Sequence, residues 1–172
     1  MNSPTDNKYE KIEQDIDKIL SEDKIYVFPP GFTIFLIVNL LLLFSAASLI
    51  ITIQDVLFTN IKTAMVFTVT SELIMAIVVV VPPALIIWGY RNAFVYLKFL
   101  VITLTILMSI FTIIETFTNG KFLPLSFAGL VCLVIVYFMI NSPTYVVFRL
   151  FTARRRELAV KKKAGVKEII GK

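Results

Sequence analysis

Three carboxylates in this sequence lie within or beside long apolar stretches, where an acid can hold a proton or a cation. They are Asp55, Glu72 and Glu115. An ionisable residue inside a membrane span is costly to bury, so it is by default a hypothesis for function. We expect the three at a similar depth, where they could form an outward metal or acid–base site. Acids at loop edges are more commonly solvated, however, and we therefore predict no metal site.

Glu72 is the acid that lies furthest inside an apolar run, in the stretch TSELIMAIVVVVPPALIIWGYR, residues 70–91. The closing letters WGYR are the aromatic and basic residues typical of a membrane interface. Twenty helical residues cover about 30 Å, so counting back from this anchor puts Glu72 in the outer third of the membrane. We expect the acid at the outer rim, where Lys62 or Lys121 could neutralise it.

Pro82 and Pro83 interrupt the same run on its inner side. Proline has no backbone N–H, so the carbonyls one turn earlier, at Val78 and Val79, lose their helical partners. The proline pair is a candidate hinge for a transport mechanism. A purely structural kink is the simpler interpretation, and we favour it.

The sequence lacks the groups that most enzymes and metal sites need. It has no histidine and a single cysteine, Cys132, which is too few for a Cys/His zinc site or an internal disulfide. It contains no Gly-rich phosphate loop, nucleophile elbow or HExxH motif. We predict a protein with no catalytic residue, no cofactor and no metal, and therefore not an enzyme.

The elements that must position these residues are long apolar runs. Hydrophobic residues make up 58% of the 172-residue chain, against about 45–50% in a soluble domain. A helix needs about 20 apolar residues to cross a bilayer. The sequence predicts an all-α membrane protein with a four-transmembrane-helix bundle over 29–142, whose spans cover about 31–54, 64–90, 93–115 and 122–142.

Lysine and arginine are distributed unequally between the two sides of the predicted bundle. Of the 17 basic residues, all but Lys62 and Lys121 lie in the chain ends or around the loop between the second and third runs. Basic residues mark the cytoplasmic side. We expect both termini in the cytoplasm and the chain in a bacterial inner membrane. The net charge of +5 then indicates anionic lipid headgroups as partners, and not nucleic acid.

The two ends of the chain have opposite character. Residues 1–28 form an acidic arm with an expected amphipathic helix, NKYEKIEQDIDKIL, whose apolar stripe must meet protein. Residues 143–172 form a basic tail that suits a helix in the inner interface. Pro143 predicts that the fourth span ends or bends at Ser142, and a tilted span that runs straight through to Phe148 is the alternative. The expected headgroup anchors are Arg91, Lys98, Arg149, Arg154, Arg155 and Arg156.

Small polar residues recur on one face of the first and third runs. These residues are Asn39, Ser45 and Ser48 in the first, and Thr105, Ser109 and Thr112 in the third. Such faces let helices approach closely and hydrogen-bond across the contact. We interpret them as packing faces, with Asn39 turned towards a partner helix. A solute path would need the same residues.

One short segment carries a resemblance. The stretch VYFMINSPTYVVF, residues 136–148, has an aromatic pair, a short polar step and the start of a basic tail. It resembles the ends of several small four-span bacterial inner-membrane proteins. The likeness covers about a dozen residues, and no function is carried over from it.

Three functions fit these features. The first is a non-enzymatic subunit or accessory factor that acts through protein–protein contacts. The second is a small homo-oligomeric ion- or proton-coupled transporter that uses Glu72 as its titrating group. The third is a membrane immunity protein against a pore-forming toxin. The first is favoured, because catalytic groups are missing and the acidic arm needs a protein partner.

Overall fold

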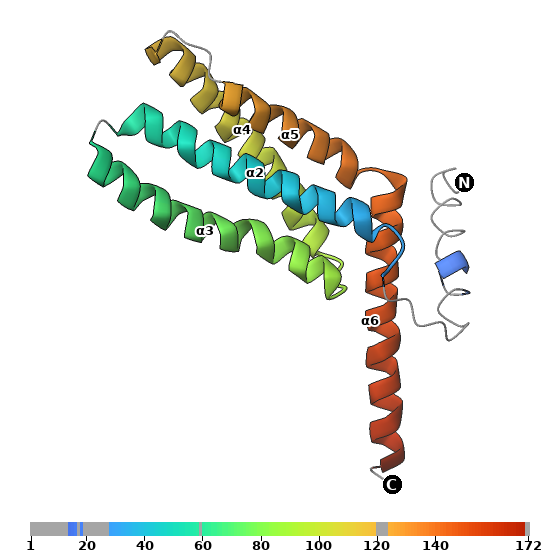
Figure 1. Cartoon of the computed structure of the whole chain (residues 1–172). Coiled ribbons are helices and arrows are strands. Elements are labelled where there is room, and N and C mark those ends of the chain that lie inside the picture. Colours follow the sequence, from blue (N-terminus) through green and yellow to red (C-terminus); the bar gives the residue numbers. More distant parts are fainter. Residues whose placement is uncertain (1–13, 17, 19–27, 59, 120–123, 171–172) are drawn as a thin grey trace.

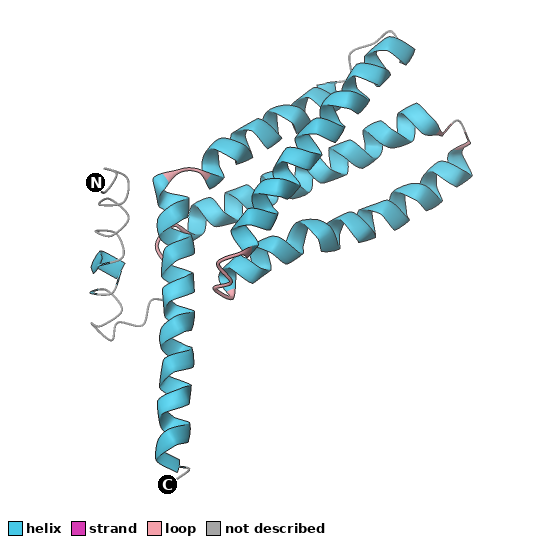
Figure 2. Ribbon diagram, turned by 180° about the vertical axis from the view of Figure 1, so that it is seen from behind, coloured by secondary structure: helices cyan, strands magenta, loops and turns pink. Residues whose placement is uncertain are grey.

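A computed structural model of the chain describes residues 14–16, 18, 28–58, 60–119 and 124–170, and these residues contain helices and no strand (Figures 1 and 2). The all-α prediction is confirmed. The long helices, in chain order, are α2 Phe32–Leu57, α3 Ile61–Ile87, α4 Ala93–Asn119, α5 Pro124–Ile140 and α6 Pro143–Ile170.

The described residues contain three to four candidate membrane spans. Helices α2, α3 and α4 are each long and apolar enough to cross a bilayer. Helix α5 has only 17 residues, which is at the lower limit for a span. It counts as a fourth span if it is joined to α6, from which a bend of 62° separates it.

Helix α2 is the centre of the bundle. It packs against α3, α4, α5 and the first part of α6, and Figure 1 shows it between α3 and α5 with α4 behind. Burial is uneven: 44% of the most apolar stretch of α2 is buried inside the chain, against 11% for α3. Most of the α3 surface therefore faces whatever surrounds the bundle.

The fourth apolar run is interrupted by a break between α5 and α6. Helix α5 stops at Ile140, and Pro143 opens α6, at the first helical position where its missing N–H costs nothing. Ser142 caps the new helix, since its hydroxyl accepts a hydrogen bond from the backbone N–H of Tyr145 at 3.3 Å. A straight helix through to Phe148 is therefore not formed, and α5 and α6 make a fourth span only as a bent pair.

Two glycines with left-handed backbone hold α6 against the bundle. Gly31, before α2, has φ 83°, and Gly89, after α3, has φ 78°. A Cβ atom on Gly31 would lie 2.6 Å from the carbonyl oxygen of Thr144, and one on Gly89 would lie 2.6 Å from that of Thr152. Both turns therefore touch the α6 backbone directly, which only glycine allows.

Aromatic rings complete this junction, which we call the α6 end of the bundle. The ring of Phe148 stacks on that of Phe35, with 4.8 Å between centroids, and Tyr145 lies beside Phe94. Tyr145 and Phe148 are both fully buried. Beyond the junction α6 extends away from the other helices (Figures 1 and 2), and Leu158 and Val160 are exposed.

The predicted amphipathic arm over 1–28 falls mostly outside the described residues. Residues 14–16 and Lys18 are helical, and Ile16 is buried. This agrees with the helical spacing expected there.

Candidate functional site

The three acids singled out in the sequence do not come together. No group of three His, Cys, Asp or Glu side chains that could hold a metal is found in the described part of the chain. Asp55 and Glu72 are exposed, whereas Glu115 is 2% exposed. The shared outward site that the sequence allowed is not formed among the described residues, and each acid has its own surroundings.

Glu72 lies beside the middle of α2. It borders a groove of about 280 Å³ between α2 and α3, together with Ala46 and Ala47. These alanines belong to the middle of the 26-residue helix α2, so Glu72 lies beside the middle of that helix, while its depth in the membrane stays a prediction. Among the described residues it forms no ion pair, and Lys121, one of its two expected partners, lies outside them.

Glu115 is the buried acid of the bundle, which corrects its expected place at a solvated loop edge. Helix α4 continues past it to Asn119 and turns its side chain inward. The Ser126 hydroxyl of α5 lies 2.5 Å from the Glu115 carboxylate, and the Thr52 hydroxyl of α2 lies 3.0 Å from that of Ser126. We call these three residues the Glu115 cluster. It joins three helices.

The Glu115 cluster continues to the backbone of α2. The Thr52 hydroxyl donates to the Ser48 carbonyl at 2.8 Å, and the Ser126 hydroxyl donates to the Glu115 carboxylate. These contacts run in series from α4 through α5 to α2, so the cluster links the three helices by polar side chains.

One of the predicted packing faces contributes a close contact between α2 and α5. Ser45 and Ser48 are buried, and the Ser45 hydroxyl donates to the Gly129 carbonyl of α5 at 3.1 Å. A Cβ on Gly129 would come within 2.9 Å of Ser48, so this is a close helix contact. Asn39 instead donates to Phe35 of its own helix.

The polar residues of the third run are likewise satisfied within their own helix. Thr105, Ser109 and Thr112 are half-buried, and each donates to the carbonyl four residues earlier in α4. They do not bond across to another helix. Their hydroxyls therefore neither hold helices together nor need a ligand.

Pro82 and Pro83 lie inside the continuous helix α3. Pro83 and Val79 are buried against the bundle. The prolines thus face protein on one side, and a hinge at this point remains a prediction.

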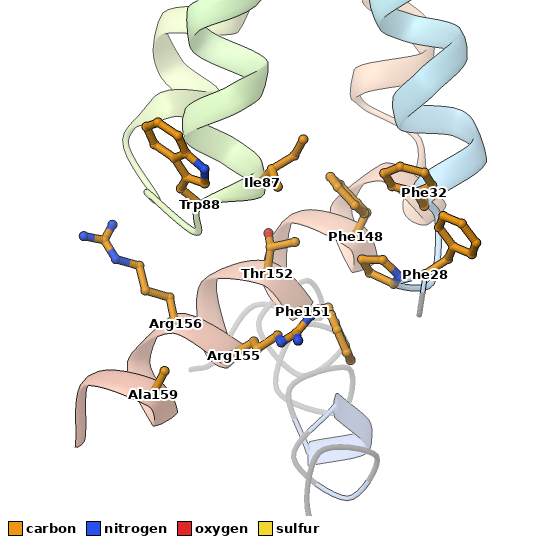
Figure 3. Close-up of a pocket in the computed structure, with 11 residues that line it drawn as sticks. Phe28, Phe32, Ile87, Trp88, Phe148, Phe151, Thr152, Arg155, Arg156 and Ala159 are labelled. Carbon is orange, nitrogen blue, oxygen red and sulfur yellow. The ribbon is translucent and has the colours of Figure 1, made fainter. Parts of the chain in front are cut away.

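A pocket of about 490 Å³ lies at the α6 end. Its walls are the start of α2, the end of α3 and one side of α6, as Figure 3 shows. Phe32, Phe148 and Trp88 supply apolar surface, and Arg155 and Arg156 stand at its border on α6. We call it the arginine–aromatic pocket.

The six expected headgroup anchors fall into two groups. Arg91 and Arg154 both lie near the carboxylate of Glu157, at 3.6 and 3.2 Å. Lys98 and Arg149 lie over the ring of Phe94, at 4.8 and 4.1 Å from its centroid. Four of the six cations are therefore engaged within the protein.

Arg155 and Arg156 form the second group. No carboxylate pairs with either in the part of the chain that the structure describes. The Arg156 guanidinium lies 3.5 Å above the centre of the Tyr90 ring, and Arg155 is exposed. Spacing alone did not separate these two from the other four.

Comparison with protein families, with curated proteins and with solved structures finds no match to this chain.

Proposed function

We propose that this chain is a non-enzymatic integral membrane protein that acts through protein–protein contacts, as a subunit or accessory factor of a membrane complex. The observation that carries the proposal is Glu72, an acid exposed on the outer surface of the bundle beside the small residues Ala46 and Ala47. Both termini then lie in the cytoplasm, as the lysines and arginines indicate.

An exposed acid in the middle of a bundle needs a partner. A carboxylate at the centre of a membrane helix costs about 2.5–3.5 kcal/mol on insertion scales when lipid surrounds it. Small residues beside it let another helix approach closely. The occupant that suits this groove is a transmembrane helix with a lysine, amide or hydroxyl opposite Glu72. A membrane immunity protein, the third expectation, would use the same kind of contact with a toxin helix.

Cross-linking and co-purification test this proposal. Ala47→Cys in a Cys132→Ser background places a thiol at the groove, and we expect it to form a cross-link to a second polypeptide in native membranes. Glu72→Leu should abolish the cross-link and the co-purified species in mild detergent, because the partner loses its acceptor. Thr70→Leu is the matched control, since Thr70 is exposed on the same helix and donates to Val66.

The outcomes of this experiment are distinct. A species that disappears with Glu72→Leu and survives Thr70→Leu supports the proposal. An isolated monomer that is unchanged by Glu72→Leu would overturn it, because leucine is then simply the better residue against lipid.

The Glu115 cluster favours a second candidate, proton-coupled transport. Glu115 is an acid buried between three helices, and its carboxylate contacts the Ser126 hydroxyl, which in turn contacts the Thr52 hydroxyl. Such a path would use Glu115 in place of the predicted Glu72. In liposomes with an imposed pH gradient, Glu115→Gln should stop proton flux while Glu72→Gln leaves it intact. Flux that is unaffected by Glu115→Gln would exclude this candidate.

A further inference from the structure

We propose that the arginine–aromatic pocket binds the headgroup of an anionic phospholipid, whose acyl chain continues over the exposed face of α3. The pocket lies where the apolar helix α2 begins, where α3 ends and where the basic helix α6 crosses both (Figure 3). Its lining therefore combines apolar side chains with the two cations Arg155 and Arg156. This site is independent of the Glu72 groove, which lies along the bundle between α2 and α3.

The positive charge of the pocket is available to a ligand. Glu157 forms ion pairs with Arg91 and Arg154. No carboxylate among the described residues pairs with Arg155 or Arg156. A phosphate group at either of these arginines would supply the missing negative charge. Arginine is suited to this role, because its planar fork of N–H donors matches phosphate oxygens.

Arg156 is held ready for such a contact. Its guanidinium stacks on the Tyr90 ring at 3.5 Å, which fixes its plane by a cation–π interaction. Stacking occupies the face of the guanidinium and leaves the donors at its edge for a phosphate. In Figure 3 Arg156 extends towards Trp88 on α3, while Arg155 points towards Phe151.

The apolar wall points to a lipid instead of a free phosphate or an acidic peptide. Ile87 and Trp88 line the pocket and are 46% and 65% exposed. Above them α3 presents further exposed residues along its length, including Val80 and Val81. A free phosphate would make no contact with this apolar surface, and an acidic peptide would not cover it. The acyl chain of a lipid would cover it.

Native mass spectrometry of the full-length protein in detergent tests the assignment. We expect bound phosphatidylglycerol to be retained in preference to phosphatidylcholine, which has no net charge. Each arginine near a lipid headgroup contributes about fivefold, so the Arg155→Gln/Arg156→Gln variant should bind phosphatidylglycerol roughly 30-fold more weakly. Lys161→Gln removes an exposed charge from the same helix outside the pocket and should change binding little.

Three further measurements separate the occupants. Soluble glycerol phosphate should not displace the lipid; displacement would mean that the pocket takes a phosphate group alone. Removal of residues 1–24, which carry the acidic arm, should leave lipid binding unchanged; tighter binding would mean that the arm occupies the pocket. Circular dichroism of the arginine variant should show unchanged helicity. Equal loss of binding in Lys161→Gln, or no loss in the double variant, would overturn the proposal.

Discussion

At the scale of single residues, Glu115 is buried because of its position on α4. It lies at the end of an apolar run, where an acid is commonly solvated. Its place on the helix was informative: it continues the buried stripe Leu97, Val101, Leu104 and Met108 at spacings that keep one helical face. The hydroxyls that meet it come from α2 and α5, and such a meeting depends on packing that no single stretch of sequence shows.

Replacing Glu115 should reveal how much the Glu115 cluster contributes to stability. Glu115→Ala removes the acid and leaves a void, so we expect the free energy of unfolding to fall by about 1–3 kcal/mol. Glu115→Gln retains a donor for Ser126 and should cost less. Denaturant titration in detergent, followed by circular dichroism, measures both. Glu72→Ala is the control, and a loss there equal to that of Glu115→Ala would contradict the prediction.

Tyr145 offers a prediction of opposite sign. Its hydroxyl is buried and has no hydrogen-bond partner in the described structure. A buried donor without a partner carries a desolvation penalty of about 1–3 kcal/mol. Tyr145→Phe removes the hydroxyl and keeps the ring that packs beside Phe94 and Phe148, so thermal unfolding in detergent should occur at a higher temperature. A lower unfolding temperature would show that the hydroxyl is satisfied.

At the scale of elements, the apolar runs predicted the helices to within a few residues, because helix length in a membrane is set by the bilayer. Helix α5 ends at Ile140 and α6 begins at Pro143, so the helix is broken where the proline predicted an end or a bend. The direction of α6 was not predictable. It is fixed by contacts from Gly31 and Gly89 to the backbone of α6, and a sequence does not show which helix a glycine turn will touch.

The two glycine turns should be essential for the seating of α6. Gly89→Ala places a side chain at positive φ and within 2.6 Å of the Thr152 carbonyl, so strain and overlap both act against it. We expect a loss of about 1–2 kcal/mol or more, and faster trypsin cleavage after Arg154 to Arg156. Asn92→Ala, an exposed change in the same connection, should leave the cleavage rate unchanged. Equal rates for both variants would contradict this role.

At the scale of the whole molecule, the distribution of charge predicts an orientation for the fold. The basic residues of α6 and of the α3–α4 connection lie at the α6 end, and the turns at the other end carry few cations. By the rule that places lysine and arginine inside, we expect the α6 end to face the cytoplasm. The long exposed part of α6 would then be available to cytoplasmic proteins, while the Glu72 groove serves contacts within the membrane.

Single-cysteine labelling tests the orientation. In a Cys132→Ser background, Thr118→Cys at the far end of α4 should react with a membrane-impermeant maleimide in intact cells. Asn92→Cys should react only after the membrane is opened. Both positions are exposed, so reactivity reports the side of the membrane. Labelling of Asn92→Cys in intact cells would reverse the predicted topology.

The two glycine contacts also make α6 act as a lever. They hold the helix at Thr144 and Thr152, which are about 12 Å apart along its axis. The helix then continues for about 27 Å to Ile170. The contact at Thr144 comes from Gly31, just before α2, and the contact at Thr152 comes from Gly89, just after α3. A small displacement of α3 relative to α2 would therefore move the C-terminal end of α6 about two to three times as far. A partner that binds between those two helices and shifts one against the other would in this way also displace the C-terminal end of α6.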